Sequence, residues 1–414
     1  MKVLFFILFL AFIDIYFYLG TISIIDKWFK NPIIYKIVYW LLSFSVYLFI
    51  LYVVYIYTEG YTDKSLSFNN KNIVYTSLFF VVLISKFIGL LPLIFDDFLR
   101  LFRFVGTFFN NSDTHDVKRL DFLKKSALLL SGALFSTLLI GMKWGRYNFK
   151  RNYQDIMIPD WPHEISNYKI IHISDLHLGS FNDIQKIDEV VELINSENAD
   201  LVVFTGDLVN NYYDEANPYI DSLKKIKAKD GKLSILGNHD YGDYTGMKRD
   251  SIEWKDNFKN LVQLQKDIGF DLLLNESRVV SSDQNKRFNI VGVENWGAGR
   301  FNKDGDLDLA MKSVDDRIPT ILLSHDPSHW SEVVLKSDYK IDLQLSGHTH
   351  GMQFGIEIPG FKWSPSQYRY KEWAGLYENS GKQIYVNRGL GHLGYAGRVG
   401  IMPDISVLNI MSKN

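Results

Sequence analysis

Four long apolar stretches lie in the first 145 residues, and they constrain the architecture of this chain more than any other feature. A helix needs roughly 20 apolar residues to cross the hydrocarbon core of a bilayer. Residues 37–57 supply 21 in a row without a charge. A cleaved signal peptide is the alternative for the first stretch, but no small-residue cleavage site is evident there. We predict four membrane-spanning helices in residues 1–145, formed by the stretches 3–25, 37–57, 73–95 and 126–142.

Asp14 and Lys86 each fall near the middle of a predicted span. Ionisable side chains inside a membrane are costly, so they pair with one another or mark a functional site. With one residue of each sign, we favour an ion pair that holds the helices together. A transporter is the competing interpretation, but two isolated charges and the lack of an internal repeat in the sequence argue against it.

Basic residues near the membrane bear on the side where the C-terminal region lies. With four spans, the N-terminus, the loop 58–72 and the C-terminal region share a side that carries seven Lys or Arg residues, against nine on the opposite side. Residues 118–124 (Lys-Arg-Leu-Asp-Phe-Leu-Lys) also resemble a twin-arginine export signal in which leucine replaces the second arginine. A chance basic cluster is the alternative for these residues. Both features favour a C-terminal region outside the cytoplasm.

The net charge and the lack of cysteine limit the partners and the metal ligands that this chain can have. The formal net charge of −2 gives no global basic field, so we expect no nucleic-acid partner. The chain has no cysteine, and disulfides and thiolate metal ligands are therefore excluded.

From Tyr168 onward, short apolar runs alternate with amphipathic stretches. The runs are typical of buried strands, and Ile184–Asn195 has apolar residues at helical spacing. We predict a layered α/β domain over residues 168–414, preceded by a linker over residues 146–167 that keeps the domain close to the bilayer. The predicted strands are Tyr168–Ser174, Leu201–Thr205, Lys232–Leu236, Phe288–Val293, Thr320–Ser324, Ile341–Ser346, Ala374–Tyr377, Gln383–Asn387 and Ile405–Ile410.

Polar motifs follow five of the predicted strands directly. The carboxyl ends of strands are where open α/β sheets place ligands, because the loops there converge on one crevice. We therefore expect these motifs to meet in a single site. They are Asp175-Leu176-His177, Gly206-Asp207, Gly237-Asn238-His239-Asp240, Ser324-His325 and Gly347-His348-Thr349-His350.

The residue types in these motifs suit metal ions. The Asp-x-His and His-x-His spacings place two donors on the same side of an extended segment, and a carboxylate such as Asp207 can bridge two cations. Asn238 adds a neutral amide oxygen, and glycines before Asp207, Asn238 and His348 let the backbone approach the ions closely. Each motif alone is usually a turn or a helix cap. Five of the ten histidines lie in this ordered set, however, whereas His172 falls inside a strand and is expected in the core.

The ordered set resembles the signature of the calcineurin-like metallophosphoesterase superfamily, D-x-H, G-D, G-N-H-D/E, H and G-H-x-H, over residues 168–410. The runs Ile173–Gly179, His350–Gln353 and Asn387–Gly391 look closest to its membrane-associated bacterial branch, which favours a bacterial inner membrane. In that branch a glycine usually stands at the position of Met352. The resemblance implies a four-layer α-β-β-α sandwich and metal-dependent hydrolysis of a phosphoester.

The resemblance also implies roles for the site residues. His239 would protonate the leaving oxygen or stabilise charge on the phosphoryl group, and Asp240 would orient His239. A hydroxide activated by two metal ions would attack phosphorus. Imidazole and carboxylate ligands suit Mn, Fe, Zn, Co or Ni, without selecting among them. One ion would be held by Asp175, His177, Asp207 and His350, and the other by Asp207, Asn238, His325 and His348.

We expect the hydrolysed bond to be a phosphodiester or pyrophosphate, and a domain held at the bilayer favours a lipid-linked phosphate or pyrophosphate as substrate. A UDP-2,3-diacylglucosamine-type pyrophosphatase of lipid A synthesis is the leading specific alternative, and nucleotide or cell-wall phosphodiesters stay open. The segments Tyr241–Arg249 and Trp363–Trp373 are candidates for the pocket wall. A catalytically inactive, membrane-tethered binding domain is the alternative of a different class. Such a domain would be expected to lose ligand residues, and here every one is present.

Overall fold

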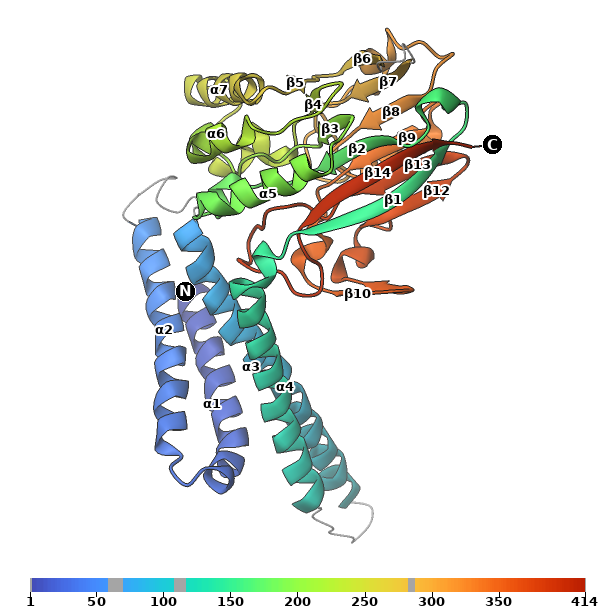
Figure 1. Cartoon of the computed structure of the whole chain (residues 1–414). Coiled ribbons are helices and arrows are strands. Elements are labelled where there is room, and N and C mark those ends of the chain that lie inside the picture. The colour runs from blue at the N-terminus through green and yellow to red at the C-terminus, as the bar shows by residue number, and fades with distance from the viewer. Residues whose placement is uncertain (1, 59–69, 108–116, 282–286, 414) are drawn as a thin grey trace. The chain divides into compact units, whose positions relative to one another are not determined.

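The computed structural model in Figure 1 describes residues 2–58, 70–107, 117–281 and 287–413. Contacts within the chain divide it into two compact units. One comprises residues 1–65 and 74–140, and the other comprises residues 66–73 and 141–414. Most of the loop 58–72, which entered the count of basic residues and includes Lys64, lies outside the described residues.

The first unit is helical. Each of its helices contains a stretch long and apolar enough to cross a membrane, as predicted. Large apolar side chains such as Phe5 and Leu48 are 74% and 67% exposed, which fits a surface surrounded by lipid. The helices are α1 (Lys2–Trp28), α2 (Ile33–Thr58), α3 (Asn70–Thr107) and α4 (Val117–Lys143).

The predicted ion pair joins the first three helices. Lys86 of α3 donates hydrogen bonds to Asp14 of α1 and, at 2.7 Å, to the hydroxyl of Ser43 of α2. The hydroxyl of Tyr47 donates a further hydrogen bond to the Asp14 carboxylate. Both charged side chains are buried away from water. Each therefore neutralises the charge of the other, as ionisable residues inside a membrane usually do.

The second unit contains two six-stranded mixed sheets. In the first sheet, the strands β2 to β5 run parallel to one another and β14 runs antiparallel to β2. Its order is β1 (Lys150–Ile158), β14 (Asp404–Ser412), β2 (Tyr168–Ile173), β3 (Leu201–Phe204), β4 (Lys232–Ser234) and β5 (Asp271–Leu272). The order of the second sheet is β12 (Gly375–Asn379), β13 (Lys382–Val386), β9 (Leu343–Ser346), β8 (Thr320–Leu323), β7 (Arg287–Gly292) and β6 (Glu276–Ser281).

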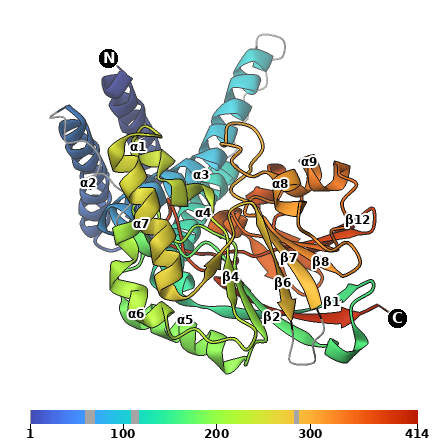
Figure 2. The ribbon, with the colours of Figure 1, turned by 90° about the horizontal axis from the view of Figure 1, so that it is seen from above.

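The two sheets pack face to face and helices cover their outer faces, which confirms the predicted four-layer α-β-β-α sandwich. A buried apolar cluster between the sheets unites residues such as Val203 of β3 with Phe288 of β7. Figure 2 shows the helices on opposite sides of the two sheets. The first sheet is covered by α5 (Ile184–Ser196), α6 (Ile220–Leu223) and α7 (Ile252–Ile268), and the second by α8 (Leu307–Met311) and α9 (Ser328–Glu332).

The interval 146–167, predicted to be a linker, contains the edge strand β1. This strand pairs in parallel with β14 from Lys150↔Asp404 to Ile158↔Ser412. Ile156 and Ile158 are fully buried, and the nearby Trp161 is 1% exposed in the cluster between the sheets. The linker prediction is therefore wrong for these residues, and we propose that the catalytic domain begins near residue 141.

Trp161 provides a test of this boundary. Its ring lies 4.8 Å from that of Phe288, and its Nε1 donates a hydrogen bond to the carbonyl of Ile165 at 3.1 Å. We expect Trp161→Ala to lower the free energy of unfolding by about 3–5 kcal/mol, because it leaves a cavity between the sheets. Chemical unfolding of the detergent-solubilised chain measures the change. Ile252→Ala, at an 80% exposed position, is the control, and an equally small effect of both variants would contradict the expected role of Trp161.

Candidate metal centre

The five motifs meet where their strands end. Asp175 and His177 follow β2, Asp207 follows β3, and the motif at Gly237 follows β4. His325 follows β8, and the His348–His350 motif follows β9. Three of the motifs thus come from the first sheet and two from the second. Main-chain hydrogen bonds between the loops, such as Asp175 N to the carbonyl of Gly206 at 2.9 Å, hold these strand ends together.

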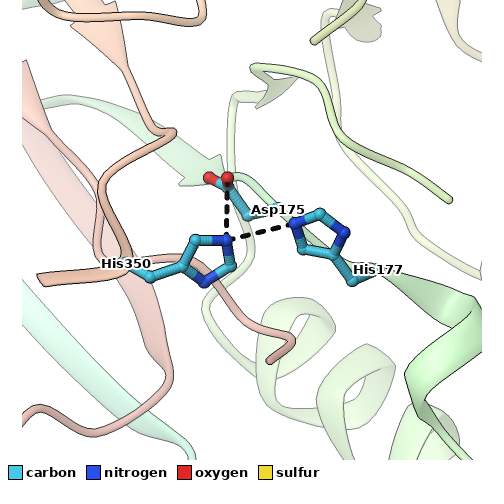
Figure 3. A group of neighbouring side chains, drawn as sticks. All are labelled: Asp175, His177 and His350. Atoms are coloured by element: carbon cyan, nitrogen blue, oxygen red, sulfur yellow. Dashed lines mark hydrogen bonds and ion pairs between the residues drawn. The ribbon is translucent and has the colours of Figure 1, made fainter. Parts of the chain in front are cut away.

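Asp175, His177 and His350 form one group of possible metal ligands, shown in Figure 3. The Nε2 atom of His350 lies 3.2 Å from Oδ1 of Asp175 and 3.1 Å from Nε2 of His177. Asp175 and His177 are fully buried and His350 is 8% exposed. The three donor atoms thus face a common point inside the domain.

Asp207, His325 and His348 form the second group. The Nε2 atom of His325 lies 3.2 Å from Oδ2 of Asp207 and 3.3 Å from Nδ1 of His348. The same Oδ2 atom of Asp207 also lies 3.5 Å from Nε2 of His177 in the first group. Asp207 therefore stands between the two groups, as a carboxylate shared by two ions must.

Asn238 has an unsatisfied oxygen at this place. Its side-chain Nδ2 donates a hydrogen bond to the hydroxyl of Tyr244 at 2.8 Å, which fixes the orientation of the amide. Its Oδ1 atom is buried and has no hydrogen-bond partner among the described residues. Buried polar atoms without a partner are rare in folded proteins, so this oxygen is suited to a metal ion.

Hydrogen bonds at the outer ring nitrogens orient three of the four imidazoles as metal sites require. Nδ1 of His177 pairs with Oδ1 of Asn210 at 3.1 Å, and Nδ1 of His325 pairs with the carbonyl of Thr205 at 2.7 Å. Nε2 of His348 lies 2.9 Å from the hydroxyl of Tyr370. Each contact leaves the opposite ring nitrogen free to face its group.

The fourth imidazole has a different outer partner. Nδ1 of His350 lies 3.2 Å from a guanidinium nitrogen of Arg398, which is fully buried. That guanidinium nitrogen also donates to the carbonyls of Gly389 and Gly391, so several main-chain oxygens share its charge. Arg398 thereby holds the loop after β13 against His350.

The backbone is strained where the donors lie. Asp175, His177, Asp207, His348 and His350 all have positive φ, between 48° and 70°. Left-handed backbone costs of order 1–3 kcal/mol for such residues and tends to cluster at functional sites. The position of Gly347 has no room for a side chain. A Cβ atom there would lie 1.9 Å from Oγ of Ser174 and 2.3 Å from Oδ2 of Asp175 and would clash with both.

The protonation states differ among the proposed ligands. Burial alone would lower the pKa of His325, but the Asp207 carboxylate raises it to about 10, so a metal ion would have to displace that proton. Burial lowers the pKa of His177 to about 3, so its imidazole is neutral, the form that binds a metal. Burial alone would raise the pKa of Asp207, but the neighbouring imidazoles, His325 foremost, hold it well below its usual value. The clustered carboxylates, imidazoles and amide oxygen therefore match the donor set of a dinuclear transition-metal site.

His239 and Asp240 lie beside this cluster, but their relation differs from the predicted one. Nδ1 of His239 pairs with the carbonyl of Asn210 at 2.7 Å. The Asp240 carboxylate instead accepts hydrogen bonds from the backbone N–H groups of Asp207, Leu208 and Gly237, at 2.8, 2.8 and 2.9 Å. Asp240 therefore shapes the backbone of two metal-site loops, whereas the predicted role was to orient His239.

Four further residues support the site. Tyr244 and Tyr370 come from the two segments that the sequence placed at the pocket wall, and Tyr244 also stacks on His239 with ring centres 4.5 Å apart. Asn210 and Arg398 were not predicted. Asn210 follows Asp207 by only three residues, so its closeness to the motif in the sequence could have indicated a place in the site. Arg398 reaches His350 only through the path of the loop after β13, which the sequence does not indicate.

Comparisons with known proteins agree with this geometry. The calcineurin-like phosphoesterase family matches residues 168–352, and the family described as "Probable Calcineurin-like phosphoesterase, transmembrane domain" matches residues 1–146. The uncharacterized metallophosphoesterase YkuE of Bacillus subtilis is 33% identical over 257 residues, which cover 61% of this chain and 82% of that protein. The chain belongs to the calcineurin-like metallophosphoesterases and is a phosphoesterase hydrolase with an integral membrane domain.

Two other relatives extend the comparison. An uncharacterized metallophosphoesterase of Helicobacter pylori is 29% identical over 352 residues, covering 83% of this chain and 85% of that protein. The phosphodiesterase YaeI of Escherichia coli is 26% identical over 248 residues, covering 59% of this chain and 82% of that protein. The similarity to the Helicobacter protein therefore extends beyond the catalytic domain.

The contacts of Asp240 lead to a prediction about stability. Burial, followed by the charge of Asp207, raises the pKa of Asp240 to about 7, so the carboxylate is ionised at pH 8. In Asp240→Asn the amide nitrogen cannot accept, and at least one buried N–H group loses its partner. We expect a loss of about 1–3 kcal/mol in the free energy of unfolding at pH 8. Asp221→Asn, at a side chain 95% exposed, is the control, and equal stability of the two variants would contradict this role.

Proposed function

We propose that this chain hydrolyses a phosphodiester or pyrophosphate bond in a lipid-linked substrate at the membrane surface. The observation that carries the proposal is the pair of ligand groups that share Asp207, with the unpartnered oxygen of Asn238 beside them. The membrane location rests on the connection between the two units. Helix α4 ends at Lys143 and β1 begins at Lys150, so only six residues separate the last span from the catalytic sheet.

The proposed ligands divide as the two groups do. Asp175, His177, Asp207 and His350 would hold one ion, and Asp207, Asn238, His325 and His348 would hold the other. When bound, such a pair of ions supplies charge stabilisation for the phosphoryl oxygens and a water of lowered pKa. Mn, Fe, Zn, Co or Ni would suit these donors.

His239 is the proposed proton donor to the leaving oxygen. The carbonyl of Asn210 can only accept a hydrogen bond, so Nδ1 of His239 carries a proton and Nε2 is left to hold or release one. Tyr244, stacked on the ring, restricts its rotation. Once Nε2 is also protonated, the fixed ring plane holds this proton in one direction, toward the leaving oxygen.

A phosphodiester is favoured because the similar protein YaeI is named a phosphodiesterase. The test is an assay of the full-length, solubilised chain, loaded with Mn, against paired phosphodiesters with and without an acyl chain. We expect turnover of both, with the higher kcat/KM for the lipid-linked compound. Equal kcat/KM values would refute the lipid preference. Bound metal without any turnover would favour a catalytically inactive binding domain.

Two variants separate the proposed roles. His239→Ala should lose about 10²–10⁴-fold in kcat while retaining its metal, because general-acid catalysis has that magnitude. Asp207→Ala should instead reduce the metal content of the purified chain, because both ions would lose a ligand. Elemental analysis beside the kinetic assay measures both effects. Identical metal content and activity in the two variants would contradict this division.

We also propose that the catalytic domain lies outside the cytoplasm of a bacterial inner membrane. The support is the nine-to-seven count of basic residues and the export-like run at residues 118–124. An alkaline phosphatase fused to the C-terminus should be active, and a fluorescent protein that folds only in the cytoplasm should be dark. The reverse pattern would overturn the orientation and favour the UDP-2,3-diacylglucosamine-type pyrophosphatase instead.

A further inference from the structure

A short β-hairpin of the catalytic domain presents an apolar face outward. It consists of β10 (Ile356–Ile358) and β11 (Phe361–Trp363), paired as Ile356↔Trp363, Glu357↔Lys362 and Ile358↔Phe361. Because side chains alternate along a strand, Ile356, Ile358, Phe361 and Trp363 share one face, which we call the hairpin face. Ile356, Ile358 and Phe361 are 48%, 57% and 53% exposed.

The opposite face of the hairpin is polar, and its side chains contact the domain while they stay exposed. Glu357 forms an ion pair with Arg388, with Oε2 of Glu357 2.9 Å from Nε of Arg388. Lys362 donates hydrogen bonds to the carbonyl of Ala374 and, at 3.1 Å, to the hydroxyl of Tyr377 in β12. These contacts connect the polar face of the hairpin to the rest of the domain.

Exposed apolar side chains flank the hairpin on both sides in the sequence. Met352 precedes it and is 47% exposed, and Tyr368 follows it and is 79% exposed. Met352 has a φ of 47°, in the left-handed region that favours glycine. A large apolar side chain therefore stands in solvent at a position where glycine would be less strained.

The hairpin begins beside the end of the last membrane helix. Gly355, next to Ile356, donates a hydrogen bond from its N–H to the carbonyl of Val399 at 2.9 Å. The N–H of the adjacent Arg398 donates to the carbonyl of Gly141 at 3.2 Å. Gly141 lies in the last turn of α4 and belongs to the same compact unit as the hairpin. At about 3.3 Å per residue, Ile358 lies within roughly 10 Å of Gly355 along the strand.

We propose that the hairpin face inserts into the boundary between headgroups and acyl chains of the bilayer, beside the exit of α4. Exposed apolar patches of this kind mark interaction sites. A bilayer is the occupant that the connectivity favours, because α4 spans it and the hairpin base is hydrogen-bonded to the loop that holds the end of α4. Aromatic residues such as Phe361 and Trp363 are suited to that depth of the membrane.

Insertion would position the metal site as well. The hairpin lies between His350 and Tyr370 in the sequence. His350 belongs to the first ligand group, and Tyr370 contacts His348 of the second. Fixing the hairpin in the bilayer therefore holds the mouth of the site near the lipid headgroups. This consequence rests on the proposed function, whereas the insertion itself does not.

The absence of cysteine from the chain allows a direct test. Phe361→Cys is labelled with nitrobenzoxadiazole, and the full-length chain is placed in nanodiscs of phosphatidylcholine and phosphatidylglycerol, with and without nitroxide-labelled lipid. We expect the nitroxide lipid to quench this probe at least about twofold more strongly than the control. The control is Val279→Cys, also an exposed apolar residue at 48%. It lies on β6, at the opposite edge of the second sheet from β12.

Ile358→Cys repeats the measurement at a second position, with melting temperatures matched to the unlabelled chain. Quenching at both hairpin positions equal to that at Val279→Cys would overturn the proposal. A blue-shifted probe that the nitroxide lipid does not quench would overturn it too, and would indicate that a protein surface, such as a second copy, covers the hairpin face. The measurement needs no turnover, so its failure is distinguishable from failure of the proposed hydrolysis.

Discussion

The arrangement of the site depends on the carboxylate of Asp207, which contacts imidazoles from both sheets. One of its oxygens lies 3.5 Å from His177, which follows β2 in the first sheet, and 3.2 Å from His325, which follows β8 in the second. The two ligand groups can share an atom only if the sheets pack with their strand ends aligned. The apolar cluster between the sheets therefore sets the distance between the proposed metal positions.

Hydrogen bonds outside the ligand groups then set the direction of each donor. A main-chain carbonyl, an amide and a phenol each pair with the outer nitrogen of an imidazole, and Tyr244 turns the Asn238 amide so that its oxygen is free. The Asp240 carboxylate accepts hydrogen bonds from the backbone N–H groups of Asp207 and Leu208. Strained left-handed backbone at five donors is tolerated because these contacts over-determine it.

The attachment to the membrane involves the same loops. The loop after β13 brings Arg398 to His350, and the N–H group of Arg398 reaches the last turn of α4. The neighbouring Val399 pairs with the base of the hairpin. Metal site, helix end and outward apolar hairpin are therefore joined through a few consecutive residues, which supports the proposal that the chemistry takes place at the bilayer surface.

Local patterns in the sequence determined the four spans, the buried strands and the positions of the proposed ligands, because each depends on residues close together in the chain. Runs of apolar residues mark a span or a buried strand wherever they occur, and a polar motif after such a strand lies at its end. Only the tertiary structure decided that Lys150–Ile158 is a strand, since it is largely polar and exposed and gains its place by pairing with β14 at the far end of the sequence. It also decided the role of Asp240 and the recruitment of Arg398, because both depend on which backbone groups folding brings within hydrogen-bonding distance.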